Sequence, residues 1–228
     1  MKKYRVVLFD LDGTLSDPKI GITKSVQYAL QKAGIEVSNL DVLESFIGPP
    51  LQVSFHEIYG FNDAQIEQAI SNYRERFKER GMFENKLYEN IPALLADLKQ
   101  QGYILAIATS KPTLFAEQIL KYFNLEHFFD LVAGSNLDGT RSAKGEIIAF
   151  VRDHFNEVDN NQFMMIGDRK YDIVGAHENQ IDSIGVTYGY GSLEELTDAQ
   201  ATYIVNSVNE LQELFNFFQY DAIMPSHN

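Results

Sequence analysis

The 228-residue sequence contains no cysteine, and none of its apolar runs is long. Without cysteine there is no disulfide framework, no thiol nucleophile and no cysteine-bound metal. No apolar run approaches the roughly 18 residues that a membrane-spanning helix needs. The run Val6–Phe9 follows a basic N-terminus but stops at Asp10, too early for the apolar region of a signal peptide. These absences predict a cytoplasmic protein with no membrane partner.

Basic residues are also in the minority. The chain has 19 lysine and arginine residues against 32 acidic ones, which gives a formal net charge of −13. A surface of this sign repels polyanions, so a nucleic acid polymer is not an expected partner. A small anionic molecule can still bind where cations are concentrated locally. With 45% apolar and 22% charged residues the composition is that of a globular protein. We expect the protein to be a monomer or a homodimer.

Three short apolar runs each end on a polar or turn-forming residue. The runs and the residues that follow them are Val6–Phe9 with Asp10, Ile104–Ala108 with Thr109, and Phe163–Ile166 with Gly167. Continuous apolar runs of this length indicate strands that are covered on both faces, as in parallel sheets. Weaker strand candidates lie at residues 131–133, 183–186 and 203–205.

Segments with helical spacing lie between these runs. Leu94, Leu95 and Leu98 form one apolar stripe, with Pro92 suited to the first helical turn and Gly102 to the stop. Strands that alternate with helices predict an α/β fold with a doubly wound, mostly parallel sheet. Right-handed crossovers would bring the carboxyl ends of all strands to one edge of that sheet.

The region between the first and second strong runs breaks the alternation. Apolar residues at helical spacing recur there, most clearly from Ile66 to Phe77, and no convincing strand separates them. We interpret residues 18–84 as an inserted all-helical domain over the functional edge of the sheet, and residues 1–17 and 85–228 as the core. An elaborated crossover packed on one face of the sheet is the alternative.

The segment Asp10-Leu11-Asp12-Gly13-Thr14 places two carboxylates just after a buried strand. A carboxylate there can act as a nucleophile and form an aspartyl-phosphate, which splits one difficult displacement into two easier ones. The second carboxylate can protonate the leaving oxygen and then deprotonate water. Taken alone, the same pattern also fits a loop in which the aspartates cap a turn.

A second acidic pair follows the third strong run, in Gly167-Asp168-Arg169-Lys170-Tyr171-Asp172. Mg²⁺ takes oxygen ligands from few carboxylates, water and substrate phosphate, and Asp10, Asp168 and a phosphate oxygen fit that description. Asp172 lies one helical turn beyond Asp168, so it suits either the metal or the cap of the helix that follows.

Hydroxyl groups and one lysine complete the candidate site. Thr109 and Ser110 end the second strong run, where hydroxyls and helix N–H groups make an anion site. Lys144 opens a predicted helix and can neutralise both a phosphate and its nucleophile, although a lone lysine is more often a solvated surface residue. Ligand sites in open α/β sheets lie beyond the strand ends, so these residues are expected to meet there.

The whole set resembles the motifs of the haloacid dehalogenase (HAD) superfamily. The likeness rests on Phe9-Asp10-Leu11-Asp12-Gly13-Thr14-Leu15, followed in order by Thr109, Lys144 and Gly167-Asp168 with Asp172. It implies a HAD-like Rossmannoid core, and for the insert it implies a C1-type cap. It further implies that Asp10 is the nucleophile, that Asp12 is the general acid and base, and that Thr109 and Lys144 hold the phosphate.

The resemblance also implies a Mg²⁺ ion held by Asp10, Asp168 and the backbone carbonyl of Asp12. Asp172 would bind the metal or stand beside it. Dehalogenases of this superfamily lack an acid at position 12, so Asp12 favours a phosphatase that acts on a small phosphorylated metabolite. The chain resembles phosphoglycolate phosphatases and their 5′-nucleotidase-like relatives. The segment from Ser135 to Lys144 resembles the nucleotidase-like branch more closely. Gly145 and Glu146 follow it in place of the Pro-x-Pro segment common among phosphoglycolate phosphatases, which argues against a glycolate-specific assignment.

Substrate contacts are expected from the cap as well as from the core. Gly48 and Pro49 lie in a rigid turn that would face the site, although the same turn also suits a plain connection between two helices. Together with Thr14 and Ser110 they are the predicted substrate-binding residues. Cations that suit the far end of a substrate, or else a solvated surface, are Lys24, His56, Arg74 and Arg76.

Two other functions share parts of this pattern. A phospho-accepting signalling module also gathers acidic residues, a hydroxyl and a lysine at parallel strand ends, but the length of the chain and the helical insert argue against it. A sugar phosphomutase shares every motif. A dinucleotide-binding oxidoreductase is disfavoured, because no G-x-G-x-x-G follows the first strand.

Overall fold

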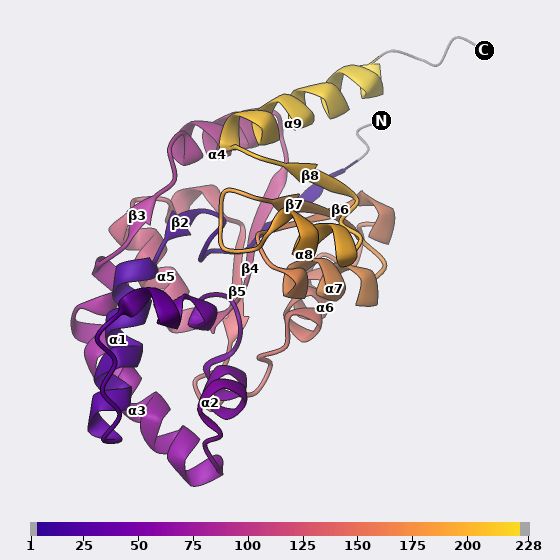
Figure 1. Cartoon of the computed structure of the whole chain (residues 1–228). Coiled ribbons are helices and arrows are strands. Elements are labelled where there is room, and N and C mark those ends of the chain that lie inside the picture. Colours follow the sequence, from indigo (N-terminus) through magenta and orange to yellow (C-terminus); the bar gives the residue numbers. More distant parts are fainter. Residues whose placement is uncertain (1–3, 224–228) are drawn as a thin grey trace.

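A six-stranded sheet forms the centre of the computed structural model, which describes residues 4–223 (Figure 1). Every neighbouring pair in it is parallel. In spatial order the strands are β5 (Leu131–Ser135), β4 (Ile104–Pro112), β1 (Val6–Phe9), β6 (Phe163–Gly167), β7 (Asp182–Val186) and β8 (Tyr203–Val205). The predicted parallel α/β sheet is confirmed, including the three strands with weaker sequence signals.

Both faces of the sheet are covered by helices. Val7 and Phe9 of β1 point into the larger apolar cluster, whereas Val6 and Leu8 belong to a second cluster on the other face. The helices α4 (Ile91–Gln100), α5 (Thr113–Tyr122) and α9 (Val208–Ile223) supply the first cluster, and α6 (Lys144–His154) and α7 (Lys170–Glu178) supply the second. Burial on two faces explains why the central strands are apolar without alternation.

The strand register brings the ends of three strands to one level. Phe9 of β1 lies opposite Ile107 of β4 on one side and Ile166 of β6 on the other. The residues that follow these positions therefore lie at the same edge of the sheet, where β1 and β6 end and β4 continues to Pro112. Because β1 lies between β4 and β6, residues from three distant parts of the sequence become neighbours there.

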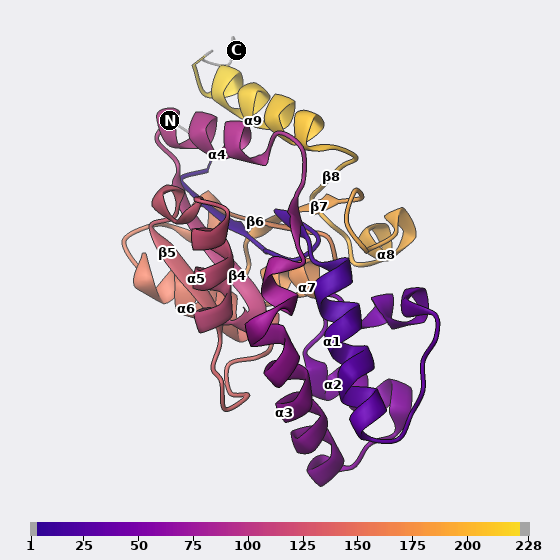
Figure 2. The same ribbon diagram turned by 90° about the vertical axis from the view of Figure 1, so that its left-hand side faces the viewer.

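Between the short strands β2 (Ser16–Asp17) and β3 (Lys86–Leu87) the described chain is helical. This insert contains α1 (Lys19–Lys32), α2 (Leu51–Tyr59) and α3 (Asp63–Glu79), with short 3₁₀ turns between them. The three helices gather at one end of the molecule, opposite α4 and α9 (Figures 1 and 2). The two strands pair antiparallel, Ser16 with Leu87 and Asp17 with Lys86, where the chain enters and leaves the insert. Two-residue strands are too short to show a period in the sequence, which is why they were not predicted.

Helix boundaries in the insert follow recognisable local signals. Gly60 ends α2 with a φ of +65°, in the left-handed region that glycine adopts most easily. Asn62 and Gln65 form a reciprocal capping box at the start of α3. Both helices then bury apolar faces in the larger cluster, Phe55 from α2 and Phe77 from α3. No helix within residues 4–223 has the length and apolar character needed to cross a membrane.

Candidate active site

Three buried carboxylates meet at the edge where the central strands end. Asp10 directly follows β1, Asp168 follows β6, and Asp172 lies in the first turn of α7. One carboxylate oxygen from each lies within 4.8 Å of those from the other two, and all three residues are buried. The backbone N–H of Asp10 donates to the carbonyl of Ile166 at 2.9 Å, which ties the first carboxylate to the strand that carries the second.

Lys144 at the start of α6 joins two of these carboxylates. Its Nζ lies 3.0 Å from Asp10 Oδ1 and 2.8 Å from Asp172 Oδ1, and it donates to the carbonyl of Ala108 at 2.9 Å. Burial alone would lower the pKa of this lysine, but the two carboxylates outweigh burial and raise its pKa above the usual range. Lys144 is therefore a fixed positive charge in contact with Asp10.

Gly13 allows the backbone to pass close to Asp168. Its φ is +81°, and a Cβ atom at this position would lie 2.1 Å from Asp168 Oδ2. Thr14, the next residue, is fully buried and donates its hydroxyl to Asp168 Oδ1 at 3.4 Å. The backbone N–H of Tyr190 donates to the other oxygen, Oδ2, at 2.7 Å. The glycine and these two donors fix the orientation of Asp168.

The charges of the site fit a divalent cation. Burial raises the pKa of Asp168 well above its usual value, and repulsion from Asp172 and Asp10 raises it further. Burial and the charge of Asp10 also raise the pKa of Asp172, to about 6, although Lys144 opposes the shift. Within the described chain, the three carboxylates of this cluster face one ammonium group, that of Lys144, and the groups that could bind a metal are all oxygen atoms. A Mg²⁺ ion would neutralise the two excess negative charges.

These raised pKa values predict how the metal-free protein responds to pH. A carboxyl group with a raised pKa keeps its proton in the folded state at a pH where the unfolded chain has lost it. The free energy of unfolding therefore falls as the pH rises from about 4 through about 6, by up to about 3 kcal/mol for a shift the size of that of Asp172. Urea titrations of the EDTA-dialysed protein at pH 5 and pH 8 measure the part of this fall that occurs above pH 5, which is about half of it for Asp172.

Asp172→Asn is the matched variant for this measurement, because the amide cannot titrate. We expect a smaller loss of stability between pH 5 and pH 8 in the variant than in the wild type. We also expect Mg²⁺ to stabilise the wild type more at pH 8 than at pH 5. Equal pH dependence in the two proteins, with no effect of Mg²⁺, would show that burial and mutual repulsion do not raise the pKa values of these carboxyl groups.

Asp12 lies apart from the acidic cluster and contacts a different lysine. Its Oδ2 lies 2.8 Å from Nζ of Lys111 in β4, whose side chain is only 6% exposed. The other oxygen, Oδ1, is buried and has no hydrogen-bond partner among the described residues. Burial raises the pKa of Asp12, and Lys111 opposes the rise. Sequence reasoning missed Lys111, although it directly follows Thr109 and Ser110 at the strand end.

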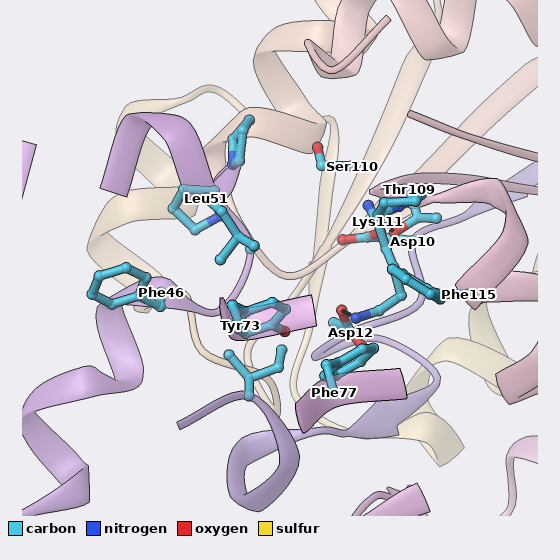
Figure 3. Close-up of a pocket in the computed structure, with 15 residues that line it drawn as sticks. Asp10, Asp12, Phe46, Leu51, Tyr73, Phe77, Thr109, Ser110, Lys111 and Phe115 are labelled. Carbon is cyan, nitrogen blue, oxygen red and sulfur yellow. Dashed lines mark hydrogen bonds and ion pairs between the residues drawn. The ribbon is translucent and has the colours of Figure 1, made fainter. Parts of the chain in front are cut away.

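A cavity between the helical insert and the sheet edge contains most of the predicted residues (Figure 3). Asp10, Asp12, Thr109 and Ser110 line it from the core side. Its remaining wall comes mostly from the insert and is largely apolar: Ile22, Phe46, Gly48, Pro49, Pro50, Leu51, Tyr73 and Phe77. Gly48 and Pro49 thus line the cavity, whereas Thr14 does not and instead donates to Asp168.

The four cations considered for the far end of a substrate do not line this cavity. Lys24 and Arg76 both pair with Glu84. His56 contacts the carbonyl of Phe61 through Nδ1, and Arg74 donates to the carbonyl of Leu137 at 2.8 Å. Among the described residues that line the cavity, Lys111 is the one with a positively charged side chain.

Arg169 fastens the insert to the core beside this cavity. It follows Asp168 in sequence, and its Nη1 donates to the carbonyl of Ile47 at 2.6 Å. Its Nε donates to Glu195 of α8 (Leu193–Asp198) at 2.9 Å, which holds the guanidinium in place. Gly48 has a φ of +106°, and a Cβ there would lie 2.8 Å from Arg169 Cγ. The loop that carries Gly48 and Pro49 is thus held by the core.

Loss of this contact should weaken substrate capture. In Arg169→Gln the charged hydrogen bond to Ile47 is lost, and bonds of this kind contribute about 1.5–3 kcal/mol. We expect kcat/KM to fall about tenfold or more, mainly through KM, because the core no longer holds the loop of Gly48 and Pro49 at the cavity wall. Lys170→Gln removes the same charge from the next residue and is the control. A raised Mg²⁺ requirement in Arg169→Gln would instead assign the effect to Asp168.

Comparison with known proteins agrees with this geometry. The sequence profile of the haloacid dehalogenase-like hydrolases matches residues 7–186. A 5′-nucleotidase of Pseudomonas aeruginosa is 44% identical over 93% of this chain and 96% of its own length. The tyrosine-protein kinase PtkA of Mycobacterium tuberculosis is 35% identical over 92% of this chain and 72% of its own length. A crystal structure described as a predicted phosphatase from Clostridium acetobutylicum is 51% identical, covers 94% of this chain and 99% of its own, and superposes with a TM-score of 0.92.

The chain therefore belongs to the haloacid dehalogenase-like hydrolase family. The doubly wound core and the helical insert that the resemblance implied are both present. The relatives carry names of more than one activity, so the chemistry of this chain has to be argued from its own residues.

Proposed function

We propose that this protein is a Mg²⁺-dependent phosphomonoesterase that works through an aspartyl-phosphate on Asp10. The observation that carries the proposal is the meeting of Asp10, Asp168, Asp172 and Lys144 at one sheet edge. Phosphoryl transfer asks a protein mainly for positioning and for stabilisation of negative charge. This arrangement offers both, beneath a cavity that the helical insert closes.

Asp10 is placed to attack phosphorus. Its Oδ1 accepts the backbone N–H of Leu11 at 2.8 Å and lies 3.0 Å from Lys144 Nζ. Those contacts leave Oδ2, for which the described residues offer no partner, to form the bond to phosphorus. As that bond forms, the bond from phosphorus to the ester oxygen breaks, and Asp12 gives its proton to the leaving oxygen. Thr109 at the cavity wall, together with Lys144, holds the phosphoryl oxygens.

The second half of the reaction reverses the role of Asp12. Its carboxylate takes a proton from water, the water oxygen bonds to phosphorus, and the bond to Asp10 breaks to release phosphate. Asp10, Asp168 and the carbonyl of Asp12 would hold Mg²⁺, with Asp172 bound to it or beside it. When bound, the metal supplies positive charge that offsets the carboxylates and the phosphate.

A small phosphorylated metabolite suits this cavity. We propose a nucleoside 5′-monophosphate or phosphoglycolate as the substrate, supported by the similarity to a 5′-nucleotidase and by the sequence likeness to phosphoglycolate phosphatases. Aromatic side chains, among them Tyr73 and Phe77, line the cavity and would exclude bulk water. We take residues 18–84 as the cap that closes over the substrate, and the rest of the chain as the catalytic core.

A panel of phosphate esters tests the proposal. With Mg²⁺ present, the purified protein should release phosphate from small phosphomonoesters, including one of the two proposed substrates. Isomerisation of a sugar phosphate without release of phosphate would identify a phosphomutase. A phospho-enzyme that lasts for hours, without turnover, would indicate a signalling module. Transfer of the phosphoryl group to tyrosine would instead indicate a protein kinase, the activity in the name of the relative PtkA.

A further inference from the structure

Lys111 occupies a position that the reaction scheme above does not use. Its Nζ lies 2.8 Å from Asp12 Oδ2 and 4.5 Å from the ring centroid of Phe77. Asp12 is the one oxygen partner of this ammonium group in the described chain, and an ammonium group carries three N–H donors. Figure 3 shows the Lys111 side chain reaching toward Asp12 alongside Phe77. The lysine therefore bridges the proposed general acid and a ring from the cap.

We propose that Lys111 is a positioning residue that aims Asp12 at the ester oxygen only while the cap is closed. The inference rests on the proposed role of Asp12 and adds a residue that acts through it. Lys111 binds Oδ2, so the carboxyl group cannot turn freely, and Oδ1 of this cavity-lining side chain is left without a hydrogen-bond partner among the described residues. Oδ1 is then the oxygen that carries the proton to the leaving group.

The cap holds Lys111 in this position through Phe77. The ring belongs to α3 of the insert and packs edge-on against Phe115 of α5 in the core, with centroids 5.6 Å apart. It also stacks on Tyr73, one turn earlier in α3, at 5.2 Å. A cation over an aromatic face is stabilised when water is kept away. If the cap opens, Phe77 leaves, water reaches Nζ, and Lys111 no longer fixes the carboxyl group.

This arrangement predicts a dependence on the leaving group. Proton donation contributes about 10²–10⁴-fold to a rate, but only where the leaving oxygen is strongly basic. In Lys111→Met we expect kcat/KM for an alkyl phosphate to fall about 100-fold, and for 4-nitrophenyl phosphate less than about threefold. Asp12→Asn should show the same selective loss with a larger amplitude. Phe77→Leu should show it with a smaller one.

A double variant tests the connection between the lysine and the ring. If Phe77 acts through Lys111, Lys111→Met combined with Phe77→Leu is no slower on the alkyl ester than Lys111→Met alone. Phe83→Leu, at an exposed ring of the same insert, is the control and should match the wild type on both esters. Additive losses in the double variant would overturn the connection to the cap.

Other outcomes separate the inference from the function on which it rests. Equal losses on both esters in Lys111→Met, with a selective loss in Asp12→Asn, would overturn the role of Lys111 and leave the phosphatase mechanism standing. A loss confined to esters with an anionic leaving group would make Lys111 a substrate-binding cation instead. No selective loss in Asp12→Asn would remove the general acid, and the inference with it.

Discussion

Replacement of Asp10 by asparagine should abolish phosphate release, with a fall in kcat of about 10⁴-fold or more. The amide keeps the size and shape of the carboxylate but is not a nucleophile, so the aspartyl-phosphate cannot form. The variant should still fold, because the amide oxygen can accept from the N–H of Leu11 and from Lys144. Steady-state assays with an aryl phosphate and saturating Mg²⁺ measure the loss, and circular dichroism checks the fold.

Asp153→Asn is the matched control for this substitution. Asp153 is an exposed residue on α6, on the same helix as Lys144 but outside the site. We expect its activity to equal that of the wild type. Near-normal turnover in Asp10→Asn would mean that another group attacks phosphorus, and the assignment of the nucleophile would be wrong.

Asp168→Asn should cause the second large loss, about 10³-fold at moderate Mg²⁺. Asp168 brings negative charge to the cluster, and its neutral replacement weakens the hold on a divalent cation. Thr14 and the N–H of Tyr190 fix the orientation of the side chain, so the variant changes charge more than shape. Calorimetric titration with Mg²⁺ should show tight binding in the wild type and weak binding in the variant.

Removal of the metal from the wild type should have the same effect as this substitution. Dialysis against EDTA should silence the enzyme, and Mg²⁺ should restore it. Asp153→Asn again serves as the control for metal binding, because it changes the same charge at a surface far from the strand ends. Activity that survives dialysis would mean that the buried carboxylates serve some other purpose.

Much of the fold was predictable because its causes are local in sequence. The runs that became β1, β4 and β6 are apolar on both faces, so burial by helices on two sides could be predicted without coordinates. Asp10, Thr109 and Asp168 each sit at or just beyond the end of such a run, and parallel pairing brings strand ends together. The meeting of these residues therefore follows from topology alone.

Lys111 and Arg169 could not be assigned in this way, since each makes a contact that crosses between the cap and the core. Lys111 lies over Phe77, and Arg169 reaches the carbonyl of Ile47, 122 positions earlier in the chain. Docking of helices decides such contacts, and no local pattern encodes it. Thr14 shows the opposite difficulty: it stands within a recognisable motif, yet its hydroxyl donates to Asp168 and the residue does not line the cavity.

Rapid-quench mass spectrometry on the holoenzyme tests the central claim most directly. The protein is mixed with substrate and Mg²⁺, quenched in acid within milliseconds, and digested for peptide mapping. We predict one transient phosphoryl group on the peptide that contains Asp10, gone within seconds and missing from Asp10→Asn. Phosphate release without any labelled peptide, or a label on a different residue, would contradict this account.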